Sequence, residues 1–312
     1  MAEGSRVPQH RDRARQLAVI GEFLILLGVL TVFFAPLPMY WVYDGQPGRG
    51  GLSFACLVCQ IIASYVIAAI LILVGYGTRK VRRWARTFSL TLLELGVVVG
   101  LAFIPPIFGL FCNPLGVILG VLFGLLAVPC ALLVPWALIN FYENRDIALT
   151  FETKDPNTYW TEKVPMPILV LTFLFVFYML ILPLPMMLNG VFPFFGVLLS
   201  GYRGIFAHNV LILCFIVLAW GTFRQRSWAW WGAVICFAAL LISSIVTFPR
   251  LGYAEILNSM AMTAYEAEEF QRKIPLQGTD LAVLAGVPFI VTLRRIILSR
   301  EHFGGARDVG ST

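Results

Sequence analysis

The sequence predicts an all-α integral membrane protein in which eight transmembrane helices form two parallel four-helix repeats, a 4+4 bundle with cytoplasmic N- and C-termini. Three observations predict this fold: the composition, the lengths of the apolar segments, and motifs that recur in the same order in both halves. Apolar residues make up 59% of the 312 residues and charged residues 13%, against roughly 45–50% and 25% in soluble domains. This composition excludes a water-soluble fold.

Eight apolar segments have the length of a transmembrane helix, which needs about 20 residues to cross a hydrocarbon core of about 30 Å. They cover residues 17–34, 52–76, 84–104, 115–139, 168–187, 205–221, 228–248 and 281–297. The eighth segment contains Arg294 and Arg295, so it crosses only if these side chains extend to the interface.

The distribution of basic residues sets the orientation, because the inner loops of membrane proteins carry an excess of Lys and Arg. With the N-terminus inside, 18 of the 23 Lys and Arg residues fall on the inner side. Seven spans instead of eight would place the C-terminal arginines outside. Tryptophan rings favour the interface, and seven of the eight fall at or beyond the inner one. Topology therefore explains the formal charge of +6.

Three motifs recur in the same order and indicate an internal duplication. Pro36-Leu37-Pro38-Met39 matches Pro183-Leu184-Pro185-Met186, Gly77-Thr78 with Arg82 and Trp84-Ala85 matches Gly221-Thr222 with Arg226 and Trp228-Ala229, and Val134-Pro135 matches Val287-Pro288. Each half has an even number of spans, so both halves enter the membrane from the same side as parallel repeats. In the Gly-Thr turns we expect the glycine to take the left-handed conformation that ends a helix.

These segments divide the chain into five parts. A cytoplasmic N-terminal segment, 1–16, precedes the first membrane repeat, 17–140, and a cytoplasmic linker, 141–167, leads to the second repeat, 168–297, and the cytoplasmic tail, 298–312. The second repeat contains an outer amphipathic segment at 249–278, with a helix predicted over 255–271. We expect this helix to lie flat on the outer surface, where it is a candidate docking site for a membrane-protein partner.

The linker predicts a short amphipathic helix over 143–152, with Ile147 and Phe151 on one face and Asp155-Pro156 as its end. The stretch Tyr142-x-Asn-Arg-Asp-Ile-x-x-x-Phe151, together with the basic Trp-Ala turns, resembles uncharacterised multi-pass membrane proteins of bacteria. The resemblance implies no activity. We expect the bacterial cytoplasmic (inner) membrane as the location.

Glu94 is the leading candidate for a ligand or proton site. It and Glu22 are the only acids inside the predicted spans, and Glu94 lies near the middle of its helix. A carboxylate there costs several kcal/mol, while holding it protonated at pH 7 costs about 3.7 kcal/mol, so its protonation state stays open. Ser64 and Tyr65 lie at a similar depth and are its candidate partners. The alternative is that Glu94 is a structural acid.

Two prolines inside predicted spans, Pro135 and Pro288, extend this site. Each lacks a backbone N–H and leaves carbonyl groups without an intrahelical partner inside the membrane. If these carbonyls and Glu94 line one polar cavity, it would hold a cation or a proton-linked ligand. If Ser or Thr hydroxyls satisfy them instead, nothing binds there.

Two further candidates concern lipid and redox chemistry. Five basic residues beside the membrane are candidates for binding an anionic lipid headgroup, each contributing about 1 kcal/mol: Arg79, Lys80, Arg82, Arg83 and Arg86. The alternative is that they only anchor a tight inner turn. Cys56 and Cys59 have the spacing of a redox pair, but the outer loop lacks the second cysteine pair that quinone-linked thiol oxidases need.

No motif for phosphate binding, zinc proteolysis or nucleophilic hydrolysis is present, and the three histidines are scattered. We therefore expect a non-enzymatic protein without cofactor or metal that does not bind nucleic acid. The sequence favours a transporter-like or ligand- or lipid-binding membrane protein. The alternative is a non-catalytic subunit or scaffold of a membrane complex. Expected partners are the lipid bilayer, including anionic lipid, and other membrane proteins.

Overall fold

The computed structural model describes residues 12–36, 51–111, 125, 129–187, 189–260, 268 and 278–304. It is 83% helical, as expected of an all-α membrane protein. Within the described residues, five helices are long and apolar enough to cross a membrane: Ala14–Phe34, Arg83–Ala102, Gly201–Phe223, Ser227–Arg250 and Gly278–Leu298. Two shorter apolar helices are Ser64–Arg79 and Met166–Ile181.

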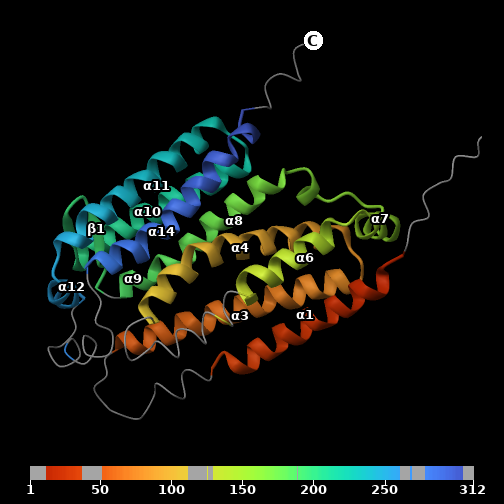
Figure 1. Ribbon diagram of the computed structural model, residues 1–312, viewed down its shortest axis with the longest axis horizontal. Helices are drawn as coiled ribbons and strands as arrows, with labels where there is room; N and C mark the ends of the chain where they lie inside the picture. The colour runs from red at the N-terminus through yellow and green to blue at the C-terminus, as the bar shows by residue number, and fades with distance from the viewer. Residues whose placement is uncertain are drawn as a thin grey trace, which may run out of the picture. The chain divides into compact units, whose positions relative to one another are not determined.

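The helices follow the predicted apolar segments (Figure 1). The longer ones are α1 (Ala14–Phe34), α3 (Gly51–Arg79), α4 (Arg83–Phe111), α8 (Met166–Ile181), α10 (Gly201–Phe223), α11 (Ser227–Thr247) and α14 (Gly278–Leu298), and α6 (Val134–Glu143) has ten residues. The shorter elements are a π-helix, η1 (Pro129–Leu133), α7 (Arg145–Lys154), α9 (Pro183–Met187), α12 (Tyr253–Ser259), and the 3-10 helices η2 (Trp160–Glu162), η3 (Phe248–Arg250) and η4 (Arg300–His302). Most of the predicted fourth span, and residues 37–39 of the first Pro-Leu-Pro-Met motif, lie outside the described residues.

The chain divides into two compact units, each formed by two stretches of sequence. The first unit comprises Met1–Leu93 and Ala137–Lys163, and the second comprises Glu94–Trp136 and Val164–Thr312. The boundaries fall inside α4 and α6, so this division differs from the predicted repeats 17–140 and 168–297.

In the first unit, α1 packs along α3 through small residues (Figure 1). A methyl group at Gly21 would lie 2.6 Å from the carbonyl oxygen of Gly75, and one at Gly28 would lie 2.9 Å from the carbonyl oxygen of Ala68. Gly21 and Gly28 are seven residues apart on α1, and Ala68 and Gly75 are seven residues apart on α3. Each pair therefore lies on one face of its helix. Because lipid is as apolar as the helix surface, such close backbone approach is what holds membrane helices together.

The predicted linker helix is confirmed as α7, which caps the same unit. The side chain of Asn144 accepts a hydrogen bond from the backbone N–H of Asp146 at its start, and Asp155 is its C-cap. Ile147 and Phe151 share the predicted face and are completely buried. The apolar face of α7 is therefore already covered within the unit.

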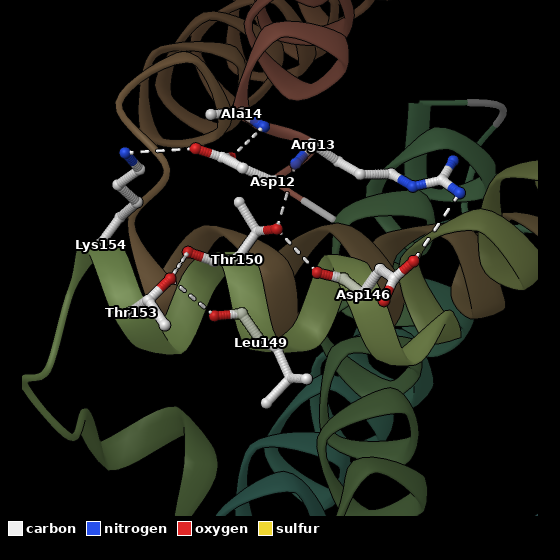
Figure 2. Close-up of polar contacts among 8 residues, drawn as sticks. All are labelled: Asp12, Arg13, Ala14, Asp146, Leu149, Thr150, Thr153 and Lys154. Carbon is white, nitrogen blue, oxygen red and sulfur yellow. Dashed lines mark hydrogen bonds and ion pairs between the residues drawn. The ribbon is translucent and has the colours of Figure 1, made fainter. Parts of the chain in front are cut away.

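Polar contacts join α7 to the segment that begins α1 (Figure 2). The backbone N–H of Arg13 donates to the Thr150 hydroxyl at 3.3 Å, and the Arg13 guanidinium lies 3.9 Å from the Asp146 carboxylate. The Lys154 ammonium lies 3.4 Å from the carboxylate of Asp12. Surface ion pairs of this kind contribute at most about 1 kcal/mol each, so the buried side chains Ile147 and Phe151 provide most of the stabilisation.

The core of the second unit lies among α8, α10, α11 and α14, which run side by side in Figure 1. α8 is apolar all round and is buried along much of its length, as expected of a central helix. At the centre, the rings of Phe175, Phe215 and Phe237 lie 5.4 to 6.2 Å apart. Aromatic pairs at this separation add about 0.5–1.5 kcal/mol each beyond the area they bury.

A short β-hairpin in the second unit was not predicted. β1 (Phe192–Phe194) pairs antiparallel with β2 (Val197–Leu199), and the two turn residues, Phe195 and Gly196, have φ of 42° and 93°. Positive φ at both positions matches the right-handed twist of a hairpin. The Ser243 hydroxyl accepts from the Phe195 N–H at 3.0 Å and the Thr247 hydroxyl accepts from the Gly196 N–H at 2.8 Å, so α11 holds the turn.

The first Gly-Thr turn ends α3 in a Schellman motif. The N–H of Arg82 donates to the Gly77 carbonyl at 2.9 Å, and the N–H of Val81 donates to the Thr78 carbonyl at 3.0 Å. The left-handed residue is Val81, with φ 53°, so the expectation that glycine takes this conformation was wrong. Gly77 is small for another reason: a methyl group there would lie 2.7 Å from the Trp84 ring.

The second Gly-Thr turn, which ends α10, has the same conformation. The N–H of Arg226 donates to the Gly221 carbonyl at 3.0 Å, and the N–H of Gln225 donates to the Thr222 carbonyl at 2.8 Å. Gln225 has φ 54°, and a methyl group at Gly221 would lie 2.5 Å from the Trp228 ring. Matching residues in the two turns therefore make matching contacts.

Candidate functional site

The most unusual side-chain contact in an apolar part of the chain joins Glu94 of α4 to Arg295 of α14, both in the second unit. An Nη–H of Arg295 donates to Oε2 of Glu94. The side chain of Arg295 is 28% exposed and that of Glu94 is 23% exposed. Charged groups inside membrane helices are costly unless they are paired, and here each charge neutralises the other.

The pair changes the expectation for Arg295. The sequence predicted that the eighth segment crosses only if Arg294 and Arg295 extend to the interface, whereas the Arg295 guanidinium contacts Glu94. Glu94 follows the first residue of α4, Arg83, by eleven positions, or about 16 Å of helix rise. An acid on another helix therefore compensates one of the two arginine charges in the predicted eighth span.

Ser64 and Tyr65, the partners predicted for Glu94, lie in α3 and belong to the first unit, whereas Glu94 belongs to the second. Ser64 is half-buried and Tyr65 is exposed. Their pairing with Glu94 stays a prediction.

A buried pair of hydroxyl groups joins Tyr178 of α8 to Thr292 of α14, the helix that carries Arg295. Thr292 is three residues and Pro288 seven residues before Arg295 in α14, so the three share one face. The Tyr178 hydroxyl donates to the Pro288 carbonyl at 3.2 Å and lies 2.7 Å from the Thr292 hydroxyl. The carbonyl it contacts is that of Pro288 itself, not the one four residues earlier that the proline leaves without its N–H.

Pro135, the other predicted proline, is the second residue of α6, and α6 directly follows the π-helix η1. A π-helical turn is one of the ways in which a helix accommodates a kink. Pro135 is half-buried and belongs to the second unit, as do Pro288 and Glu94.

The Arg295 guanidinium retains an unused donor. Its Nε–H is buried and has no hydrogen-bond partner among the described residues. A buried donor left without a partner costs about 1–3 kcal/mol, and more for a charged group. Such a donor favours a small anion or polar ligand at this position.

The predicted lipid-binding cluster of the first turn is largely engaged by acids of its own unit. Arg79 lies 3.5 Å from Glu22, Arg82 lies 3.8 Å from Asp155, and Arg83 lies 2.6 Å from Glu162. The Nε–H of Arg86 donates to the Tyr142 carbonyl at 3.1 Å, and Lys80 is exposed. Lipid binding by these five residues stays a prediction, but three of their charges are already paired.

Asp155, which we did not predict as a site residue, is the centre of this arrangement and is 2% exposed. The Tyr159 hydroxyl donates to its carboxylate at 3.0 Å, and the backbone N–H of Arg83 donates at 3.3 Å. Burial by itself raises the pKa of Asp155, but these hydrogen bonds, with those from Asn157 and the charge of Arg82, outweigh burial and hold the pKa below its ordinary value. An ionised Asp155 thus joins the linker to the first turn. Its place directly after an amphipathic helix was the only sequence signal.

Within the described residues, no group of three or more His, Cys, Asp or Glu side chains could hold a metal ion. Cys130, Cys214 and Cys236 are free thiols. Cys112 lies outside the described residues, and Cys56 and Cys59 lie in α3. Redox chemistry at this pair stays untested.

No known protein family matches the chain, and neither a curated protein nor a solved structure is significantly similar to it. The resemblance to uncharacterised bacterial membrane proteins therefore remains an expectation, and function is argued from the site alone.

Proposed function

We propose that this protein is a transporter-like membrane protein that binds a small anion at Arg295, with binding linked to protonation of Glu94. The observation that carries the proposal is the Glu94–Arg295 pair, which joins two apolar helices and leaves the Arg295 Nε–H without a hydrogen-bond partner among the residues that the structure describes. Ionisable groups inside membrane helices are rare, and they mark ligand and proton pathways.

Arg295 changes the kind of ligand that Glu94 favours. A cation at Glu94 would lie beside the guanidinium, and the repulsion between like charges opposes its binding. An anion instead competes with the Glu94 carboxylate for the same donors. Protonation of Glu94 weakens that competition, so uptake of a proton and binding of an anion favour each other.

The test is thermal unfolding of the purified full chain in neutral detergent, with a panel of small carboxylates and inorganic phosphate at pH 5.5 and pH 7.5. Glu94→Gln mimics the protonated acid, so we expect it to be stabilised by an anion at both pH values. The original protein should be stabilised mainly at the lower pH. Arg295→Gln should lose the effect at both. No anion-dependent shift in any of the three proteins would overturn the proposal.

The second candidate function is a non-catalytic subunit or scaffold, in which the same pair only ties α4 to α14. Breaking a fully buried pair costs about 3–5 kcal/mol, and at about a quarter exposure we expect on the order of 2 kcal/mol. In this case Glu94→Gln and Arg295→Gln would each lower stability without any anion dependence, and a stoichiometric partner protein would co-purify in mild detergent.

The architecture that we propose is the eight-span 4+4 bundle of two parallel repeats. Its support is the equivalence of the two Gly-Thr turns, each with its left-handed residue four positions after the glycine. Arg86 and Trp230, which lie 144 positions apart, are also equivalent in their contacts. The Arg86 Nε–H donates to the Tyr142 carbonyl, and the Trp230 indole N–H donates to the Ile296 carbonyl at 2.8 Å. Location in the bacterial inner membrane rests on the resemblance alone.

Cysteine labelling tests the topology. In a cysteine-free background, Thr158→Cys and Gly304→Cys should react with a membrane-impermeant reagent only from the cytoplasmic side. Tyr202→Cys, at a residue that is 90% exposed and lies in the first turn of α10, just before the predicted sixth span, should react only from outside. Labelling of Gly304→Cys from outside would remove the eighth span and the 4+4 architecture with it.

A further inference from the structure

A second set of arginines gathers at the second Gly-Thr turn. Arg224 and Arg226 lie in the turn between α10 and α11, and Arg300 lies in η4 after the end of α14. The N–H of Gly304 donates to the Gln225 carbonyl at 3.4 Å, so the segment after α14 packs against the turn. Arg224, Arg226 and Arg300 are exposed and are called the inner basic patch below.

Tryptophan rings orient two of these arginines. The Arg224 guanidinium carbon lies 5.5 Å from the centre of the Trp220 ring, and that of Arg300 lies 5.3 Å from the centre of the Trp230 ring. The Trp230 indole is itself held by its hydrogen bond to the Ile296 carbonyl. A guanidinium stacked on a ring keeps its N–H groups free at its edge, where they match the oxygens of a phosphate.

The inner basic patch differs from the first turn in its acids. Arg79, Arg82 and Arg83 each lie within 4 Å of an Asp or Glu carboxylate. In the part of the chain that the structure describes, Arg224, Arg226 and Arg300 have no such partner. The nearest acid in the sequence, Glu301, lies 3.6 Å from His302. The charge of this patch is thus available to an external anion.

Exposed tryptophans border the patch. Trp220 and Trp228 are 56% and 45% exposed, and their ring centres lie 6.5 Å apart. Amphipathic indole rings favour the depth of the lipid headgroups, so a cation stacked on Trp220 lies at the level of the lipid phosphates.

We propose that the inner basic patch is a binding site for the headgroup of an anionic phospholipid, with Arg224, Arg226 and Arg300 contacting the phosphate and Trp220 and Trp228 contacting the glycerol and upper acyl region. The exposed rings of Trp220 and Trp228 favour a lipid over a soluble anion. This site is separate from the Glu94–Arg295 pair and does not depend on it.

The test is native mass spectrometry of the full chain transferred from nanodiscs that contain phosphatidylglycerol in phosphatidylcholine. The original protein should retain phosphatidylglycerol preferentially. Each arginine attracts anionic lipid with about a fivefold gain in affinity, so R224Q/R226Q/R300Q should weaken retention about 100-fold. If this variant does not elute as a folded protein, R224Q and R300Q are measured singly, each with an expected loss of about fivefold.

The matched control removes three other exposed cations assigned to the inner side, Arg15, Arg145 and Lys163, as R15Q/R145Q/K163Q. This control should keep preferential retention. Equal loss in both triple variants, or loss in neither, would overturn the proposed site. Displacement of the lipid by an excess of inorganic phosphate alone would show that the patch binds free phosphate, which also overturns the assignment to lipid.

Discussion

Gly21→Ala is expected to separate α1 from α3 and to lower the thermal stability of the protein sharply. The added methyl group would lie 2.5 Å from the backbone nitrogen of Arg79 and 2.6 Å from the carbonyl oxygen of Gly75. Both contacts are with backbone, which cannot rotate away as a side chain can. The loss of stability should therefore exceed that of ordinary overpacking, which is about 1–3 kcal/mol. Thermal unfolding in detergent measures it.

The matched control is Gly96→Ala in α4, because a methyl group at Gly96 meets no atom within 4 Å. Alanine is a better helix former than glycine by about 1 kcal/mol, so the control should be neutral or slightly stabilised. The same substitution should thus lower thermal stability at Gly21 and leave it unchanged or raise it at Gly96. Equal melting temperatures for the two variants would contradict the close packing of α1 on α3.

Gly77→Ala and Gly221→Ala are expected to destabilise the protein by similar amounts, on the order of 2 kcal/mol. Each new methyl group would meet a tryptophan ring, 2.7 Å away at Trp84 and 2.5 Å away at Trp228, and also the methyl group of the alanine that follows that tryptophan. Equivalent turns should respond equally if the two halves derive from one repeat.

Double-mutant cycles separate this packing from a general effect of glycine substitution. Trp84→Leu should offset part of the cost of Gly77→Ala and leave the cost of Gly221→Ala unchanged, while Trp228→Leu should do the reverse. Additive effects within a turn would show that the ring does not occupy the space beside the glycine.

Most of the helical structure was predictable from the sequence. Apolar runs of membrane length predicted the long helices, because a chain in lipid must satisfy its backbone hydrogen bonds within each span. The helical spacing of Ile147 and Phe151, with Asp155-Pro156 behind them, predicted α7 and its end. The recurrent Gly-Thr and Trp-Ala motifs predicted two equivalent turns, although the reason for their glycines was packing against Trp84 and Trp228 rather than a left-handed backbone.

The pairing of the charged side chains became apparent only in the folded protein. Arg295 and Glu94 are separated by 201 positions, and no periodicity along either helix could indicate which residue of the other it would contact. For the same reason the sequence grouped Arg82 and Arg83 as candidate lipid ligands, whereas in the structure they form ion pairs with the linker acids Asp155 and Glu162. Local pattern specifies which face of a helix is apolar, but the partner of a polar group depends on which helices pack together and at what register.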